Sequence, residues 1–141
     1  MSDLVGTCPK DFWEQWVAEG DAAGTPSCKT CGGEGSVGQA DEGTLAACPD
    51  CEEWSWFTKH SLAASIRPGD RFYVVAHGKL RGWAPVTRVG LVPVAGAGWE
   101  ICRRGRATAC TIPETIPGFR GLRVRWWKRE QEIAFENWRE S

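Results

Sequence analysis

The sequence predicts an α+β protein built around a small, closed or partly closed β-barrel, with flanking helices and an inserted zinc finger. Three observations support this prediction. Short apolar runs separated by glycine and proline fill most of the chain after residue 54, an aromatic segment with helical spacing precedes them, and two C-x-x-C pairs lie in between. Because 141 residues suit one domain, we expect a single domain over residues 1–141, with residues 24–54 forming the inserted finger.

The first expected element is a helix over residues 9–19. Pro9 suits the first helical turn, where its missing N–H costs no hydrogen bond, and Gly20 is a natural stop. Four apolar residues share one face at helical spacing: Phe12, Trp13, Trp16 and Val17. We interpret this aromatic face as core rather than as a ligand site.

The finger is predicted from cysteine spacing. Cys28 and Cys31 form one pair, Cys48 and Cys51 form the other, and sixteen residues separate the pairs. Four thiolates satisfy the tetrahedral preference of zinc and leave no open position, so one structural Zn²⁺ per chain is expected. Two disulfides or unrelated thiols are the alternatives. The surrounding residues 20–53 hold almost no large apolar side chain, so folding of this segment would depend on the metal.

The rest of the chain predicts short strands. Residues 71–77 and 80–94 should form strands joined by a tight turn at Gly78, and Gly105 is interpreted as a hairpin turn between 99–103 and 106–112. The last strand is expected over 121–127. Alternation along it places Leu122, Val124 and Trp126 on one face and Arg123, Arg125 and Trp127 on the other. Trp126 is therefore expected in the core, and Trp127 among the arginines.

Charge is distributed unevenly along the chain. Residues 1–57 carry 2 basic and 11 acidic side chains, whereas residues 58–141 carry 15 and 7. Basic residues with interleaved aromatics suit contacts with phosphates and unstacked bases. The candidates for nucleic-acid contact are His77, Lys79, Arg81, Trp83, Arg120, Arg123, Arg125, Trp127, Lys128 and Arg129. A solvated strand face and an ordinary exposed hairpin are the alternatives.

Two resemblances extend this interpretation. Residues 28–35 (CKTCGGEG) resemble one C-x-x-C-x-G-x-G element of the DnaJ-type zinc fingers. Residues 66–75 (IRPGDRFYVV) and 78–82 (GKLRG) resemble a stretch of PUA-like domains of the ASCH and EVE kind, and residues 121–127 and 135–138 resemble the closing part of such a domain. The second resemblance implies a twisted barrel with flanking helices and a basic cleft that binds RNA or DNA, sometimes with one flipped, modified base in an aromatic cage.

The leading functional hypothesis is a nucleic-acid-binding module that reads RNA, or a modified or unpaired base in DNA. The alternatives are a nuclease or base-processing enzyme on the same fold, and an adaptor whose acidic finger docks a protein partner. No catalytic motif is present, although a pairing of Cys102 or Cys110 with His77 remains an alternative. Seven cysteines, an odd number, and the lack of a signal peptide or long apolar stretch lead us to expect a cytoplasmic protein with no membrane association.

Overall fold

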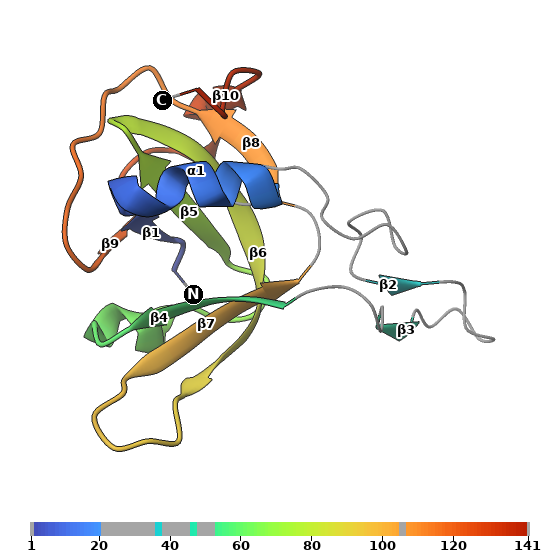
Figure 1. Ribbon diagram of the computed structural model, residues 1–141, viewed down its shortest axis with the longest axis vertical. Coiled ribbons are helices and arrows are strands. Elements are labelled where there is room, and N and C mark those ends of the chain that lie inside the picture. The colour runs from blue at the N-terminus through green and yellow to red at the C-terminus, as the bar shows by residue number, and fades with distance from the viewer. Residues whose placement is uncertain (1, 21–35, 38–45, 48–52, 105–106, 141) are drawn as a thin grey trace.

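The computed structural model describes residues 2–20, 36–37, 46–47, 53–104 and 107–140 (Figure 1). Its helices and strands are β1 (Leu4–Thr7), α1 (Lys10–Glu19), β2 (Ser36–Val37), β3 (Ala46–Ala47), β4 (Glu53–Thr58), the 3₁₀ helix η1 (Ser61–Ser65), β5 (Arg71–Ala76), β6 (Lys79–Leu91), β7 (Trp99–Arg104), β8 (Thr108–Thr111), β9 (Leu122–Val124), the 3₁₀ helix η2 (Arg129–Gln131) and β10 (Ile133–Ala134).

Eight of these strands form one curled half-barrel sheet (Figure 1). Its main path runs β10-β8-β6-β5-β1-β9, and β7 joins β6 to the outer strand β4. The pairing of β1 with β5 is parallel, whereas the other pairs of this sheet are antiparallel. The strand-rich body and the single α-helix among the described residues confirm the predicted α+β class at this coarse level.

The long strand β6 organises the sheet, and it corrects the prediction of a hairpin at Gly105. Val86 of β6 pairs with Arg103 of β7, and Trp83 of β6 pairs with Thr108 of β8. Both β7 and β8 therefore run antiparallel to β6 on successive parts of its length, so the chain keeps its direction between them. The hairpin turn lies instead between β6 and β7, over residues 92–98.

The sheet buries apolar side chains on both faces. On one face, Leu4, Phe72 and Val74 pack with Trp13 of α1. On the other face, residues of the alternate register, including Val5 and Tyr73, pack under the C-terminal segment that supplies Ile116 and Trp127. Side chains alternate between faces along a strand. Alternate residues of β1 and β5 therefore pack into two separate cores, one on each face of the sheet.

Helix α1 and the turn before β6 match their predictions closely. Trp13 is fully buried and Trp16 and Val17 are half-buried, whereas Phe12 is 51% exposed and lies outside the predicted core face. The helix ends at Gly20, whose φ of 75° is left-handed, as a C-terminal glycine allows. His77 and Gly78 have φ of 48° and 76°, and two positive φ values suit the tight turn that joins β5 to β6.

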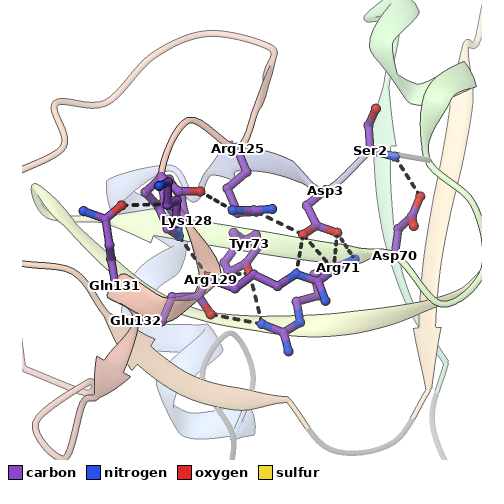
Figure 2. A network of polar contacts seen from close by, with 11 residues as sticks. Ser2, Asp3, Asp70, Arg71, Tyr73, Arg125, Lys128, Arg129, Gln131 and Glu132 are labelled. Atoms are coloured by element: carbon purple, nitrogen blue, oxygen red, sulfur yellow. Dashed lines mark hydrogen bonds and ion pairs between the residues drawn. The ribbon is translucent and has the colours of Figure 1, made fainter.

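A network of ionic contacts joins the two ends of the described chain (Figure 2). The carboxylate of Asp3 accepts hydrogen bonds from the backbone N–H of Arg71 at 2.9 Å, from Nε of Arg125 at 3.0 Å, and from Nε and Nη2 of Arg129 at 3.0 and 2.9 Å. Glu132 accepts from the Tyr73 hydroxyl at 2.6 Å and from the Trp127 indole at 2.9 Å. Asp3, which directly precedes β1, thereby helps to fix the position of the C-terminal segment.

We expect the contribution of Asp3 to stability to be lost in acid. Burial alone raises the pKa of the Asp3 carboxyl, but the hydrogen bonds from Arg71, Arg129 and Arg125 outweigh burial and hold the pKa below its ordinary value. The stabilisation is therefore present above the unfolded pKa of about 3.9 and disappears as pH falls through the lower folded value. At neutral pH, Asp3→Asn should lower the free energy of unfolding by about 2 kcal/mol.

Urea denaturation of the native protein and of Asp3→Asn, at pH 7 and at steps below pH 4, measures this effect. The difference in free energy of unfolding between the two proteins should become smaller as the pH falls. Because acid affects other groups equally in both proteins, those effects cancel in this difference. Glu136→Gln, at an exposed carboxylate, is the matched control. A difference that stayed constant down to pH 2 would show that Asp3 stabilises the fold without its charge.

Candidate nucleic-acid interface

A cavity of about 120 Å³ opens between α1 and strands β4, β5, β6 and β7. Its walls are largely aromatic and aliphatic, with one charged side chain among the described lining residues. We call this cavity the aromatic pocket. It is lined by Trp16, Trp54, Ser55, Trp56, Phe72, Val74, Val86, Ile101, Cys102 and Arg103.

Strand pairing positions the wall on the β4 side. Trp54 pairs with Arg103 and Trp56 pairs with Ile101 across β4 and β7, and directly paired residues share a face of the sheet. The half-buried Trp56 ring contacts Trp16 of α1, with centroids 5.8 Å apart, and Phe72 of β5 at 5.0 Å. Elements that are far apart in the sequence therefore place three rings around one space.

Gly6 of β1 allows this arrangement of rings. A Cβ atom on Gly6 would lie 2.8 Å from Cζ2 of Trp56 and 3.0 Å from Cζ of Phe72. Both distances are shorter than ordinary carbon–carbon contacts of about 3.5–4.0 Å. Any larger residue at this position would force the Trp56 or Phe72 ring to shift, so the glycine in β1 allows the close approach of these two rings.

Arg103 gives the aromatic pocket its charge. The guanidinium carbon lies 5.4 Å from the centre of the Trp54 ring, in the range of a cation–π contact. Burial lowers the pKa of Arg103 to about 10, which still leaves the group positively charged at neutral pH. A positive charge inside an aromatic pocket disfavours a cationic ligand and favours a neutral or anionic one.

The cysteine thiols described in the structure do not suit nucleophilic chemistry. Cys8, Cys102 and Cys110 are buried and free of disulfides. Burial raises the pKa of Cys8 and of Cys110 to about 12, and it also raises the pKa of Cys102. Because the thiolate is the reactive form, these thiols are protonated and unreactive near neutral pH, which argues against pairing either Cys102 or Cys110 with His77.

Two of the residues expected to contact nucleic acid lie buried in the core. Trp127 is 6% exposed, whereas Trp126 is 42% exposed, the reverse of the expected assignment. Arg81 is 1% exposed and donates hydrogen bonds from Nε to the carbonyl of Ala76 and from Nη1 to the carbonyl of Trp138. Neither side chain can reach a ligand from these positions.

Other predicted contact residues divide between the ionic network and a separate surface. Arg125 and Arg129 both pair with Asp3, whose single negative charge offsets one of their two positive charges. Arg120, Arg123 and Lys128 are exposed, and the Arg123 guanidinium lies 4.4 Å from the centre of the Phe119 ring. We call the group formed by the half-buried Phe119 and the exposed Arg120, Arg123, Trp126 and Lys128 the Trp126 surface.

The Trp126 surface and the aromatic pocket belong to opposite faces of the sheet. Arg123 pairs with Val5, which lies in the core under the C-terminal segment. Phe72 of the pocket pairs with Leu4, the next residue of β1, which lies in the core under α1. Since side chains of neighbouring residues on a strand point to opposite faces, one bound base cannot touch both groups.

The three remaining candidates lie apart from the pocket. His77 and Lys79 are exposed at the turn between β5 and β6, and the ring of Trp83 is half-buried under the guanidinium of Arg71, at 3.9 Å. The proposed zinc ligands Cys28, Cys31, Cys48 and Cys51 lie outside the described residues. Within the described ranges, no group of three or more His, Cys, Asp and Glu side chains could hold a metal ion.

Sequence reasoning missed the aromatic pocket as a site. The aromatic face that contains Trp16 was interpreted as core, and Trp54, Trp56 and Arg103 were not among the candidate contact residues. The available signal was the Trp-Ser-Trp alternation of residues 54–56, which places two indoles on one strand face. Nothing local to the sequence links that face to Trp16 or to Phe72.

Comparisons with protein-family models, with curated proteins and with solved structures found no match to this chain. No helix within the described part of the chain is long and apolar enough to cross a bilayer.

Proposed function

We propose that this protein binds nucleic acid, RNA or DNA, by taking one unpaired base into the aromatic pocket. The observation that carries the proposal is a cavity of about 120 Å³ walled by three tryptophans and a phenylalanine. An apolar cavity of about 150 Å³ can hold benzene, so this volume suits a single six-membered ring. Stacking of a base on an aromatic side chain contributes about 1–3 kcal/mol, which makes such a wall an effective binding surface.

A planar base fits the pocket better than the other common ligand of aromatic sites. Cages of tryptophan and tyrosine also recognise quaternary ammonium groups. Here the Arg103 guanidinium already lies over Trp54 and would repel a second cation. A neutral base with hydrogen-bond acceptors meets no such repulsion, and its ring can contact the other aromatic faces.

The wider assignments are also proposals. The curled, strand-rich body and the aromatic pocket support a PUA-like domain of the ASCH or EVE kind. The four-thiolate donor set of Cys28, Cys31, Cys48 and Cys51 suits one structural Zn²⁺. The free, buried thiols at the three described cysteines support a reducing compartment such as the cytoplasm.

Removal of one indole from the pocket tests the proposal. Trp54→Ala should weaken binding of a mixed-sequence single strand about tenfold, because one stacking contact is lost. Fluorescence anisotropy of a labelled strand at low salt, with RNA and DNA measured separately, gives the affinities. Circular dichroism of each variant establishes that it is folded.

Trp126→Ala is the matched control, because it removes an exposed indole from the opposite face. The proposal expects this variant to bind like the native protein. If Trp126→Ala abolished binding and Trp54→Ala did not, the Trp126 surface would be the interface and the aromatic pocket would have no role in it. Absence of binding to any RNA or DNA at low salt would refute nucleic-acid binding altogether.

A further inference from the structure

The polar groups around the aromatic pocket are mostly hydrogen-bond donors. Among the described lining residues, Arg103 carries the only charge, and Trp16, Trp54 and Trp56 bring indole N–H groups. Ser55 and Cys102 also line the pocket, but their side-chain Oγ and Sγ atoms lie 3.5 Å apart, within hydrogen-bonding distance of each other. No carboxylate, amide or imidazole belongs to the described lining. The pocket therefore favours a base edge that presents acceptors.

Arg103 further restricts which base the pocket favours, because a guanidinium donates through N–H groups that lie in one plane as a fork. Its five N–H donors can serve a ligand in addition to other partners. The fork is best satisfied by two neighbouring acceptors on one planar edge, as in the bidentate contact of arginine with guanine O6 and N7. If a base carries an N–H between its two acceptors, this N–H faces the N–H donors of the guanidinium, and no hydrogen bond forms between them.

The four common bases differ in this respect. The Watson–Crick edge of cytosine carries two neighbouring acceptors, N3 and O2. Uracil and thymine carry an N–H at position 3 between their two carbonyls. Guanine has the acceptor pair O6 and N7, whereas adenine has no two neighbouring acceptors on one edge. Both are purines with two fused rings, and a cavity of about 120 Å³ suits one ring.

Resting on the proposed function, we propose that the aromatic pocket selects a cytosine-type pyrimidine, with the Arg103 fork donating hydrogen bonds to N3 and O2 of the base. The aromatic walls supply affinity for any pyrimidine ring. Arg103 supplies the discrimination between cytosine and uracil.

The test uses single strands in which every nucleotide is abasic except one. Four such strands carry cytosine, uracil, adenine or guanine at the central position, and a fifth is abasic throughout. Anisotropy titrations with the full-length protein give the five affinities. Cytosine should bind about tenfold or more tighter than uracil, the discrimination expected of a good bidentate contact.

Arg103→Lys separates the fork from the charge. Lysine keeps the positive charge but cannot make the planar bidentate contact, so this variant should bind the cytosine and uracil strands with similar affinity. Arg120→Lys, at an exposed arginine on the Trp126 surface, should keep the native preference. Thermal denaturation establishes that both variants fold like the native protein.

The outcomes are distinguishable. Equal binding of the cytosine and uracil strands by the native protein, with both weakened by Trp54→Ala, would overturn the cytosine inference and leave base binding intact. A preference for uracil or for a purine, or a cytosine preference that survives Arg103→Lys, would also overturn it. Equal affinity for all five strands, the fully abasic one included, would overturn base binding and the cytosine inference together.

Discussion

Replacement of Arg81 by methionine is expected to lower the free energy of unfolding by about 3 kcal/mol or more, since each buried carbonyl left without its donor costs about 1–3 kcal/mol. Arg81 is 1% exposed. Its guanidinium binds the carbonyls of Ala76, Trp138 and Glu140 and lies 4.9 Å from the centre of the Trp13 ring. Methionine retains much of the hydrocarbon volume but supplies no donor.

Chemical denaturation with urea measures this loss. Arg120→Met is the matched control, because Arg120 is exposed and its replacement should change the free energy of unfolding by less than about 0.5 kcal/mol. Hydrogen exchange should show early opening of residues 135–140 in Arg81→Met. If the two variants were equally stable, the hydrogen bonds of Arg81 would contribute nothing to the position of the C-terminal segment.

Removal of zinc is expected to have the largest effect on the chain. Binding of a structural Zn²⁺ contributes about 10–16 kcal/mol of folding free energy in zinc-finger peptides near neutral pH. Residues 21–52 connect α1 to β4, and both elements carry tryptophans of the aromatic pocket. Metal loss should therefore lower thermal stability and also weaken binding of a single strand.

Elemental analysis of the purified protein should give about one zinc per chain, and Cys31→Ser should reduce this content sharply. Cys110→Ala is the control, because this buried thiol lies outside the C-x-x-C pairs and its replacement should leave the zinc content unchanged. If the purified native protein contained no metal, was fully folded, and stayed equally stable after treatment with a chelator, the zinc site would be refuted.

Local patterns predicted the elements well, because helix and strand periodicity depends on neighbouring residues. The helix at residues 10–19 and the strand at residues 71–76 lie within one residue of their expected bounds. The alternation of residues 121–127 failed because β9 ends at Val124, after which the period-two rule no longer applies. Trp126, which was expected in the core, is therefore exposed, and Trp127, which was expected among the arginines, is buried.

Arg81 was mispredicted because of a register shift. Val74 pairs with Gly82 and Val75 pairs with Leu80, so Arg81 is the extra residue of a β-bulge. A bulge redirects a side chain relative to the regular pleat. This redirection accounts for the placement of a charged residue in the core within an otherwise ordinary strand.

The candidate site depended on contacts that are distant in sequence. Asp3 pairs with Arg125 and Arg129, more than 120 positions away, so its one negative charge offsets part of the charge of the predicted basic patch. The aromatic pocket combines Trp16, Trp54 and Phe72 from three separate elements. Composition alone could predict many arginines and tryptophans, but only the pairing of strands decides which of them share a face.

The most direct test of base binding in the aromatic pocket is an NMR spectrum of the indole N–H groups. The chain has nine tryptophans, and single Trp→Phe variants assign their resonances. On addition of a strand that carries a single base in an abasic backbone, the resonances of Trp16, Trp54 and Trp56 should shift. The resonance of the exposed Trp126 on the opposite face should stay in place. Shifts at Trp126 without any at the three pocket indoles would contradict base binding in the pocket.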